Sequence, residues 1–186
     1  MNNTILNQTV IPSVRELKHL DLALKSPSPF ILLSEAHIGN LQLLTKRCHA
    51  VNKKVLVHLD LIGGLSKDQI GLKMLRDLYK IDGVISPNAN LLKRVKDLGL
   101  ISIQRLFLLD SRSLESGLKS MEERHLDALE LLPGPFSLYV IEKVRKTTSL
   151  PLLAGGFISE DRMVKKLFEG GIKGITTSEK HLWKTK

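Results

Sequence analysis

Short apolar segments alternate with amphipathic ones along almost the whole chain of 186 residues, and this alternation limits the fold more than any other feature. Several apolar segments carry no polar residue on either face, which is typical of parallel strands that helices cover. Regular alternation of strands with helices predicts parallel pairing through helical crossovers. The expected strands lie at residues 9–11, 30–33, 55–60, 82–85, 102–108, 128–132, 151–154 and 174–178.

An amphipathic segment follows each expected strand and predicts a helix there. These helices are expected at residues 14–24, 40–51, 66–79, 89–98, 113–122, 137–146, 160–169 and from 179 onward. Ser66 is predicted to cap the third of them within a capping box, and Ser159 is predicted to cap the seventh.

Eight strand–helix units close a small (β/α)₈ barrel of the TIM type, and we expect the whole chain, residues 1–186, to form one such domain. Such barrels usually take about 250 residues and rarely fewer than about 200, so this chain needs minimal loops. The alternative is an open doubly wound parallel sheet, which would follow if the first or the last strand is misassigned.

The composition favours a cytoplasmic protein with a polyanionic partner. Lys and Arg outnumber Asp and Glu by 28 to 19, which gives a formal net charge of +9. The single cysteine, Cys48, excludes an internal disulfide and fits a reducing compartment. The first four residues are polar and uncharged, unlike a signal peptide, and no apolar run approaches the ~18 residues of a membrane span. We therefore expect no membrane partner.

Small residues follow the last two expected strands, which is where barrels of this type bind phosphate. Gly155 and Gly156 end the seventh strand, and Thr177 and Ser178 end the eighth. Backbone N–H groups at a helix start favour anions, and glycine lets a ligand approach the backbone closely. These four residues are the predicted phosphate site, although a glycine pair after a strand also serves as an ordinary tight turn.

Polar residues inside the expected barrel are candidates for contacts with the rest of a ligand. Strand residues alternate between the helix-facing side and the interior. Because one side of the third strand is wholly apolar, His58 and Asp60 are predicted to point inward, and the same argument turns Glu130 inward. Buried polar groups need partners. These partners are either the hydroxyls of a small polyol phosphate or other side chains of a structural network.

The fifth strand carries two further polar candidates. Gln104 has the inward parity together with Ser102, so Gln104 is predicted to contact the ligand. Arg105 has the outward parity unless the strand bulges. Arg105 therefore either anchors a helix or turns at the strand end toward an anion.

The sequence shows no complete catalytic motif. Glu35, Asp60 and Asp110 lie near expected strand ends and have the chemistry for acid–base work. No lysine stands at a strand end to form a Schiff base, no histidine pair has metal-binding spacing on a helix, and neither a P-loop nor a nucleophile elbow occurs. We expect a binding protein without catalytic residues, metal or cofactor. The alternatives are a barrel enzyme acting on a small sugar phosphate or triose phosphate, and a scaffolding barrel without a ligand.

Five segments stand together in the order and spacing of one known family. They are Val55-Leu-Val-His-Leu-Asp-Leu-Ile-Gly-Gly-Leu-Ser66, Asp82-Gly-Val-Ile-Ser86, Gln104-Arg-Leu-Phe-Leu-Leu-Asp-Ser111, Leu131-Leu-Pro-Gly134 and Ala154-Gly-Gly-Phe-Ile158. From Ile11 onward the chain resembles the glycerol uptake operon antiterminator regulatory proteins. It departs from them at Phe157, where an aliphatic residue is commoner, and at Glu35.

This resemblance implies a small barrel that senses glycerol 3-phosphate, binds the leader of glycerol-operon mRNA and prevents early termination. The effector's phosphate would lie at the glycine pair and its hydroxyls would face Asp60 and Glu130. Two basic groups on the outer faces of helices are predicted to contact the RNA, although solvated helix faces also explain them. They are Lys93, Arg94 and Lys96 in one helix and Arg162, Lys165 and Lys166 in another. A monomer this small offers little surface to a structured RNA, so we expect a homo-oligomer, in the simplest case a dimer.

Overall fold

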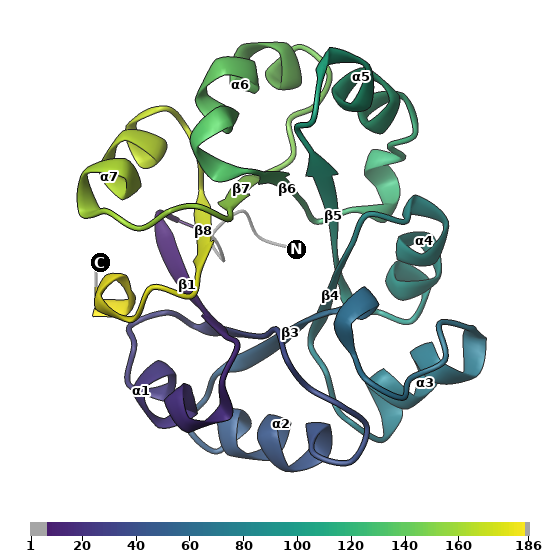
Figure 1. Cartoon of the computed structure of the whole chain (residues 1–186). Coiled ribbons are helices and arrows are strands. Elements are labelled where there is room, and N and C mark those ends of the chain that lie inside the picture. Colours follow the sequence, from purple (N-terminus) through teal and green to yellow (C-terminus); the bar gives the residue numbers. More distant parts are fainter. Residues whose placement is uncertain (1–6, 185–186) are drawn as a thin grey trace.

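The computed structural model describes residues 7–184 and shows a closed barrel of parallel strands inside a ring of helices (Figure 1). Each strand pairs with the next strand along the chain, and the last strand pairs with the first. The strands are β1 (Thr9–Val14), β2 (Phe30–Leu33), β3 (Lys54–His58), β4 (Gly83–Ser86), β5 (Ile101–Phe107), β6 (Ala128–Leu132), β7 (Leu152–Gly155) and β8 (Gly174–Thr177). The barrel prediction is therefore confirmed, and closure between β8 and β1 excludes the open sheet.

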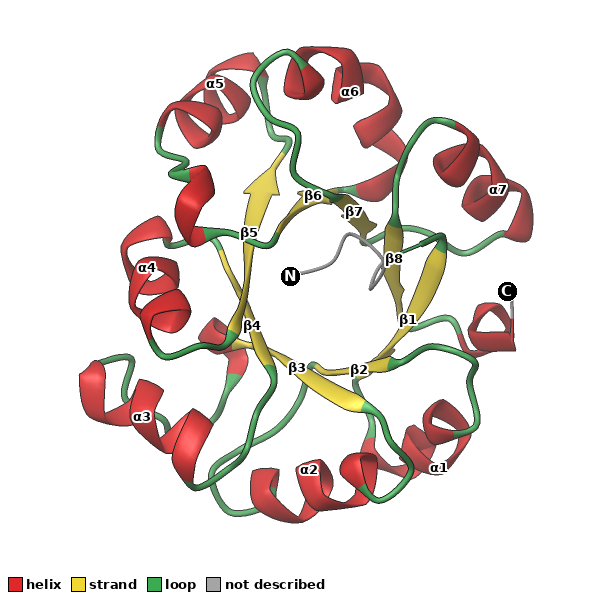
Figure 2. Cartoon of the chain, turned by 180° about the vertical axis from the view of Figure 1, so that it is seen from behind, coloured by secondary structure: helices red, strands yellow, loops and turns green. Residues whose placement is uncertain are grey.

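Seven α-helices of the described residues cover the outside of the barrel, and Figure 2 shows the same ring from the opposite end. They are α1 (Leu20–Leu24), α2 (Leu41–His49), α3 (Gln69–Asp77), α4 (Ala89–Asp97), α5 (Ser111–Lys119), α6 (Ser137–Arg145) and α7 (Asp161–Glu169). A 3-10 helix, η5 (Lys180–Lys184), takes the position in which an eighth helix was expected. Across the part of the chain described, no helix combines the length and the apolar character that crossing a membrane requires.

The first helix is shorter than its sequence pattern predicts. Ser13 and Val14 pair with Leu32 and Leu33 of β2 and thus stay in the extended strand β1. The chain then forms a 3-10 helix, η1 (Leu17–His19), before α1 begins. Pairing with β2 thus outweighs the helical pattern of the segment, and the side chain of Leu17 is left exposed.

Two predicted helix caps are wrong. Helix α3 is capped by Asp68, whose Oδ1 accepts hydrogen bonds of 2.9 Å from the N–H groups of Ile70 and Gly71. Ser66 instead donates a hydrogen bond of 2.7 Å to Asp68, and these contacts hold the pKa of the Asp68 carboxyl below its usual value. Helix α7 has Glu160 at its N-cap, without a capping side chain.

Two layers of apolar side chains hold the fold together. The larger layer lies between the strands and the helices, and Val55, Val57 and Leu59 belong to it as the alternation predicted. The smaller layer fills the part of the barrel interior that lies away from the carboxyl ends of the strands. Its members are Ile11, Phe30, Leu32, Leu56, Ile85, Ile103, Ala128 and Leu153. Because apolar residues close this part of the barrel, polar interior residues are confined to the carboxyl ends of the strands.

Candidate functional site

A cavity of about 800 Å³ opens at the carboxyl ends of the strands. It is lined by Ser13, Arg15, Ser34, Glu35, His58, Leu61, Arg105, Leu132, Gly156, Phe157, Ile158, Ser159, Thr176, Thr177, Ser178 and Glu179. The loop after β7 and the end of β8 with the loop that follows it thus supply half of the lining, and the ends of β1, β2, β3, β5 and β6 with the residues that follow them supply the rest. This is the end of the barrel at which barrels of this fold place their functional sites.

The loops after β7 and β8 are held to each other by the hydroxyl of Thr177. This hydroxyl donates a hydrogen bond of 2.9 Å to the carbonyl oxygen of Ile158 and accepts one of 3.1 Å from the N–H of Glu179. The indole of Trp183 in η5 donates a hydrogen bond of 2.9 Å to the carbonyl oxygen of Thr177. The edge of the cavity is therefore fixed by hydrogen bonds rather than left as a free loop.

The same two loops present backbone donors that the protein does not use. Among residues 7–184, no protein group accepts a hydrogen bond from the N–H of Phe157, Ser159 or Ser178. Gly156 and Phe157 both have left-handed backbone conformations, with φ of 73° and 58°. For a non-glycine residue this conformation carries strain, and such strain concentrates at functional sites. The loops therefore offer several N–H groups to an anion.

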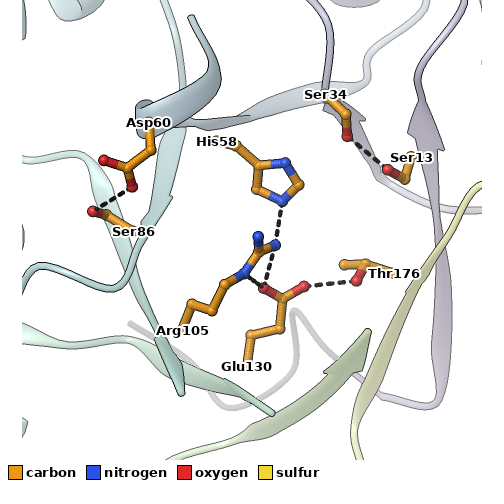
Figure 3. A network of polar contacts seen from close by, with 8 residues as sticks. All are labelled: Ser13, Ser34, His58, Asp60, Ser86, Arg105, Glu130 and Thr176. Carbon is orange, nitrogen blue, oxygen red and sulfur yellow. Dashed lines mark hydrogen bonds and ion pairs between the residues drawn. The ribbon is translucent and has the colours of Figure 1, made fainter. Parts of the chain in front are cut away.

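A polar network forms the floor of the cavity (Figure 3). Glu130 is fully buried, and its Oε2 accepts a hydrogen bond of 2.8 Å from Nε of Arg105 and forms an ion pair with Nη2 at 2.8 Å. Its Oε1 accepts a hydrogen bond of 2.6 Å from the hydroxyl of Thr176. Nη2 of Arg105 also contacts Nε2 of His58. Four strands thus meet in one network, and the carboxylate of Glu130 compensates the charge of Arg105.

His58 is 92% buried in this network. Burial and the neighbouring guanidinium of Arg105 lower the pKa of His58 to about 4. His58 is therefore neutral at physiological pH. Beside it, the hydroxyls of Ser13 and Ser34 lie 2.6 Å apart at the ends of β1 and β2.

The predicted orientation of β5 is wrong. Ile103 belongs to the interior apolar layer and Arg105 lines the cavity, so Ser102 and Gln104 face the helices. Gln104 is buried there and does not line the cavity, which removes it as a candidate contact. Arg105 pairs with Glu130 in the register of β5 and β6, so it points inward without a bulge.

Two further predicted contacts occupy different places from those expected. Strand β3 ends at His58, and Asp60 lies in a 3-10 helix, η2 (Leu59–Leu61), outside the cavity lining. Its carboxylate accepts hydrogen bonds of 3.1 Å from the hydroxyl of Ser86 and from Nζ of Lys67.

Gly155 likewise lies beneath the cavity rather than at its surface. A Cβ atom there would stand 2.4 Å from Oγ1 of Thr176 and 2.9 Å from Oε1 of Glu130. Gly155 thus makes room for the network rather than for a ligand. Of the predicted phosphate residues, Gly156, Thr177 and Ser178 line the cavity.

Apart from Ser159 and Glu179 in the loops after β7 and β8, the sequence interpretation missed four polar residues of the cavity. They are Ser13, Arg15, Ser34 and Thr176. Arg15 forms only a loose ion pair with Glu35, in which the charged atoms lie 3.8 Å apart and both side chains are exposed. Strand parity could have found the others, since Ser13 follows Ile11 and Ser34 follows Leu32 on the interior side.

The two predicted basic groups lie on the outer faces of α4 and α7. Lys93, Arg94, Arg162, Lys165 and Lys166 are exposed. Lys96 is half-buried and donates a hydrogen bond of 2.5 Å to Asp127, so its charge serves the contact between α4 and the start of β6. The group on α7 is therefore the more accessible one, and its helix begins at the cavity loop after β7.

Four exposed aromatic side chains lie at the same end of the barrel as the cavity, and one of them, Phe157, lines it. They are Phe107, Phe136, Tyr139 and Phe157, which lie at the ends of β5, β6 and β7 or at the start of α6. Tyr139 and Phe157 are 85% and 87% exposed, and the rings of Phe136 and Tyr139 lie 6.1 Å apart. We call these four residues the aromatic rim.

The fold and the cavity define the class of this protein: a small TIM-type barrel with a cavity, lined in part by polar side chains, at the carboxyl ends of its strands. Among the residues described, no cluster of three or more His, Cys, Asp or Glu side chains is placed to hold a metal ion. Residues 10–183 match the family of glycerol-3-phosphate responsive antiterminators, and the chain belongs to this family.

Similar proteins span nearly the whole chain. The uncharacterised protein YgcP of Escherichia coli is 30% identical over 177 residues, which cover 94% of this chain and 91% of YgcP. The glycerol uptake operon antiterminator regulatory protein of Listeria monocytogenes is 32% identical, with a TM-score of 0.90 and 98% of each chain covered.

Two more distant structures show the fold alone. A glycerol uptake operon antiterminator-related protein of Thermotoga maritima is 23% identical, with a TM-score of 0.84 over 96% of this chain and 98% of that one. The tryptophan synthase subunit alpha of Campylobacter jejuni is 16% identical, with a TM-score of 0.67 over 94% and 87% of the two chains. The same architecture thus serves regulators and enzymes, and it does not by itself determine function.

Proposed function

We propose that this protein is a transcription antiterminator that binds glycerol 3-phosphate in the cavity and, in response, binds the leader mRNA of glycerol-catabolism operons. The observation that carries the ligand proposal is the set of unused backbone N–H groups in the loops after β7 and β8. They lie where barrels of this fold bind phosphate, and the family responds to a small phosphate ester.

Calorimetry and thermal unfolding test ligand binding. A ligand at ~100 times its dissociation constant stabilises the protein by about 2.7 kcal/mol. Ser178→Asp places a negative charge among the N–H donors and should abolish this stabilisation by glycerol 3-phosphate. Ser116→Asp is the matched control, because Ser116 is exposed on α5, outside the cavity. Equal binding by the two variants would place the phosphate elsewhere.

The site supports binding rather than catalysis. A general base needs a free lone pair and a pKa near the working pH. Both carboxylate oxygens of Glu130 already accept hydrogen bonds from protein groups, and Nε2 of His58 is occupied by Arg105. We infer that the protein converts none of the sugar phosphates or triose phosphates that it binds. Turnover of any of them by the purified protein would favour the enzyme alternative.

The exposed basic group on α7 is the proposed RNA surface. Arg162, Lys165 and Lys166 stand clear of the cavity, so RNA and effector can be bound together. Because α7 starts at the cavity loop, a ligand bound at that loop contacts the segment from which this group extends. The aromatic rim, at the end of the barrel where α7 begins, offers rings on which unpaired bases can stack.

Salt dependence of RNA binding tests this surface. Each phosphate contact contributes about 0.7–0.9 to the slope of log affinity against log salt. A triple variant with glutamine at Arg162, Lys165 and Lys166 should therefore bind RNA more weakly and with a flatter slope. The control triple carries glutamine at Lys25, Lys46 and Lys54. These lysines are also exposed, and their replacement removes the same amount of positive charge. A slope that changes equally in both triples would exclude α7 as the contact surface.

The group on α4 is the second RNA candidate, and Lys93→Gln with Arg94→Gln tests it in the same assay. Lys96 is left unchanged because its ion pair with Asp127 is part of the fold. We also propose that the protein acts as a homodimer in the cytoplasm, where nascent mRNA is found. Light scattering that gives a monomeric mass with and without effector would contradict the dimer.

A further inference from the structure

Hydrogen-bond donors without acceptors gather at the floor of the cavity, and their arrangement begins with the tautomer of His58. Nη2 of Arg105 contacts Nε2 of His58. A guanidinium group has only donors, so Nε2 must accept this hydrogen bond and carries no proton. The single proton of the neutral ring therefore resides on Nδ1.

The Nδ1–H of His58 has no partner. Within the described part of the chain no group accepts its hydrogen bond, and the atom is shielded from solvent. Buried polar groups are almost always paired, so an unpaired one in a cavity wall calls for an explanation. His58 itself lines the cavity, and in Figure 3 its ring stands between Arg105 and the pair formed by Ser13 and Ser34.

Arg105 adds a further donor to the floor, beside the hydroxyls of Ser13, Ser34 and Thr176, which can donate or accept. Nη1 of Arg105 makes no hydrogen bond to a protein group between residues 7 and 184, whereas Nε and Nη2 are both used. Oε1 of Glu130 is taken by Thr176, and Oε2 is taken by Arg105. Because Glu130 is also fully buried and does not line the cavity, its carboxylate orients the guanidinium rather than receiving a ligand hydroxyl.

The floor is at the same time nearly neutral, because Glu130 compensates Arg105 and His58 is uncharged. A neutral, donor-rich surface suits an uncharged oxygen atom that accepts hydrogen bonds. It suits an ammonium group badly, because that group would bring further donors and a positive charge beside Arg105.

We propose that His58 is a specificity-determining residue whose Nδ1–H, together with Nη1 of Arg105, donates hydrogen bonds to a hydroxyl oxygen at the unphosphorylated end of the ligand. Glu130 is the positioning residue that aims Arg105. This inference rests on the proposed function and orients the ligand, with its phosphate at the loops after β7 and β8 and its polyol end on the floor. The sequence interpretation had assigned the hydroxyl contacts to Asp60 and Glu130 instead.

Calorimetry with three phosphate esters tests the proposal on the wild-type protein. The esters are glycerol 3-phosphate, propane-1,2-diol 1-phosphate, which lacks the terminal hydroxyl, and phosphoethanolamine, which ends in an ammonium group. We expect the deoxy ester to bind about 10-fold more weakly than glycerol 3-phosphate, as the loss of one hydrogen bond implies, and phosphoethanolamine weaker still. Equal affinities for the three esters would overturn the inference and leave the proposed function standing. No binding of any ester would overturn both.

Variants of His58 identify the donor. His58→Phe keeps a ring without a donor, so the 10-fold preference for glycerol 3-phosphate over the deoxy ester should shrink to less than about 2-fold. His58→Asn places an amide N–H near the position of Nδ1 and should restore most of the preference. His49→Phe is the control, since His49 lies at the far end of the barrel beside Asp82. An undiminished preference in His58→Phe would refute the role of His58.

Nitrogen-15 NMR of the wild-type imidazoles supplies a readout that does not depend on the folding of any variant. The ligand-free protein should show one neutral histidine with its proton on Nδ1 throughout the range from pH 5.5 to 8. The signal of this Nδ1 should shift when glycerol 3-phosphate binds. A proton on Nε2, or a signal that the ligand leaves unchanged, would contradict the assignment.

Discussion

The ion pair between Glu130 and Arg105 should dominate the stability of the cavity floor. Glu130 is fully buried and the side chain of Arg105 is 15% exposed, with 2.8 Å between their charged atoms. Glu130→Gln keeps the shape of the side chain but leaves the guanidinium without its countercharge. Breaking a buried pair in this way costs about 3–5 kcal/mol, and the partial exposure of Arg105 places the expected loss near ~3 kcal/mol. For a chain of this size, that corresponds to a fall in Tm of roughly 6–12 °C.

Urea unfolding followed by circular dichroism measures this loss, and the chain offers a matched control. Glu115 and Lys143 also form an ion pair, with a distance of 2.7 Å, but about half of each side chain is exposed. Exposed pairs of this kind often contribute nothing measurable. Glu115→Gln should therefore leave the unfolding midpoint almost unchanged. A loss in Glu130→Gln no larger than that in Glu115→Gln would refute the structural role assigned to the buried pair.

Three further perturbations follow from the same structure. Gly155→Ala should destabilise the protein by about 3 kcal/mol in urea unfolding, because its Cβ would lie 2.4 Å from a buried hydroxyl oxygen. In Gly156→Ala the new Cβ would have no atom closer than 3.8 Å, so this variant should lose only about 1 kcal/mol of stability, through its left-handed backbone. Equal losses of stability in the two variants would contradict the packing argument. The stability of the wild type relative to His58→Phe should fall as the pH decreases from about 6.5 to about 4. The unfolded chain takes up a proton in this range whereas folded His58, with its pKa of about 4, does not. At ~1.4 kcal/mol per pH unit the fall amounts to roughly 3 kcal/mol, and parallel stability curves for the two proteins would contradict the burial of a neutral ring. Asp68→Ala should lower the unfolding midpoint more than Ser66→Ala, because Asp68 accepts the hydrogen bonds at the start of α3; the reverse order would restore Ser66 as the cap.

Strand alternation predicted the barrel and most of its interior correctly, since an apolar face can be recognised without knowledge of tertiary contacts. It failed at β5, where Ile103 faces inward and Gln104 faces the helices. The assumption behind the error was that polar strand residues point into the barrel. The barrel interior away from the carboxyl ends of the strands is in fact an apolar layer, to which Ile103 belongs. The inward face of β5 becomes polar only at Arg105.

The sequence predicted those residues of the candidate site whose place follows from their position in the barrel. It missed the contacts that depend on the register between neighbouring strands. Gly156, Thr177 and Ser178 line the cavity because the loops after the last two strands must meet at one end of a closed barrel. The partnership of Arg105 with Glu130 depends instead on which residues of β5 and β6 lie side by side. Strand parity alone does not reveal this register, and the direction in which the side chain of Arg105 points was therefore left open.

Coupling between effector and RNA is the central claim, and a titration of a glycerol-operon leader RNA with the protein tests it most directly. Fluorescence anisotropy at fixed salt would be recorded without and with saturating glycerol 3-phosphate. We predict that the effector tightens RNA binding by a factor between about 5 and 150, the usual range of coupling between two sites. By linkage, the RNA should raise the affinity for glycerol 3-phosphate by the same factor. Absence of RNA binding at every effector concentration would contradict the assignment of this barrel as an RNA-binding regulator.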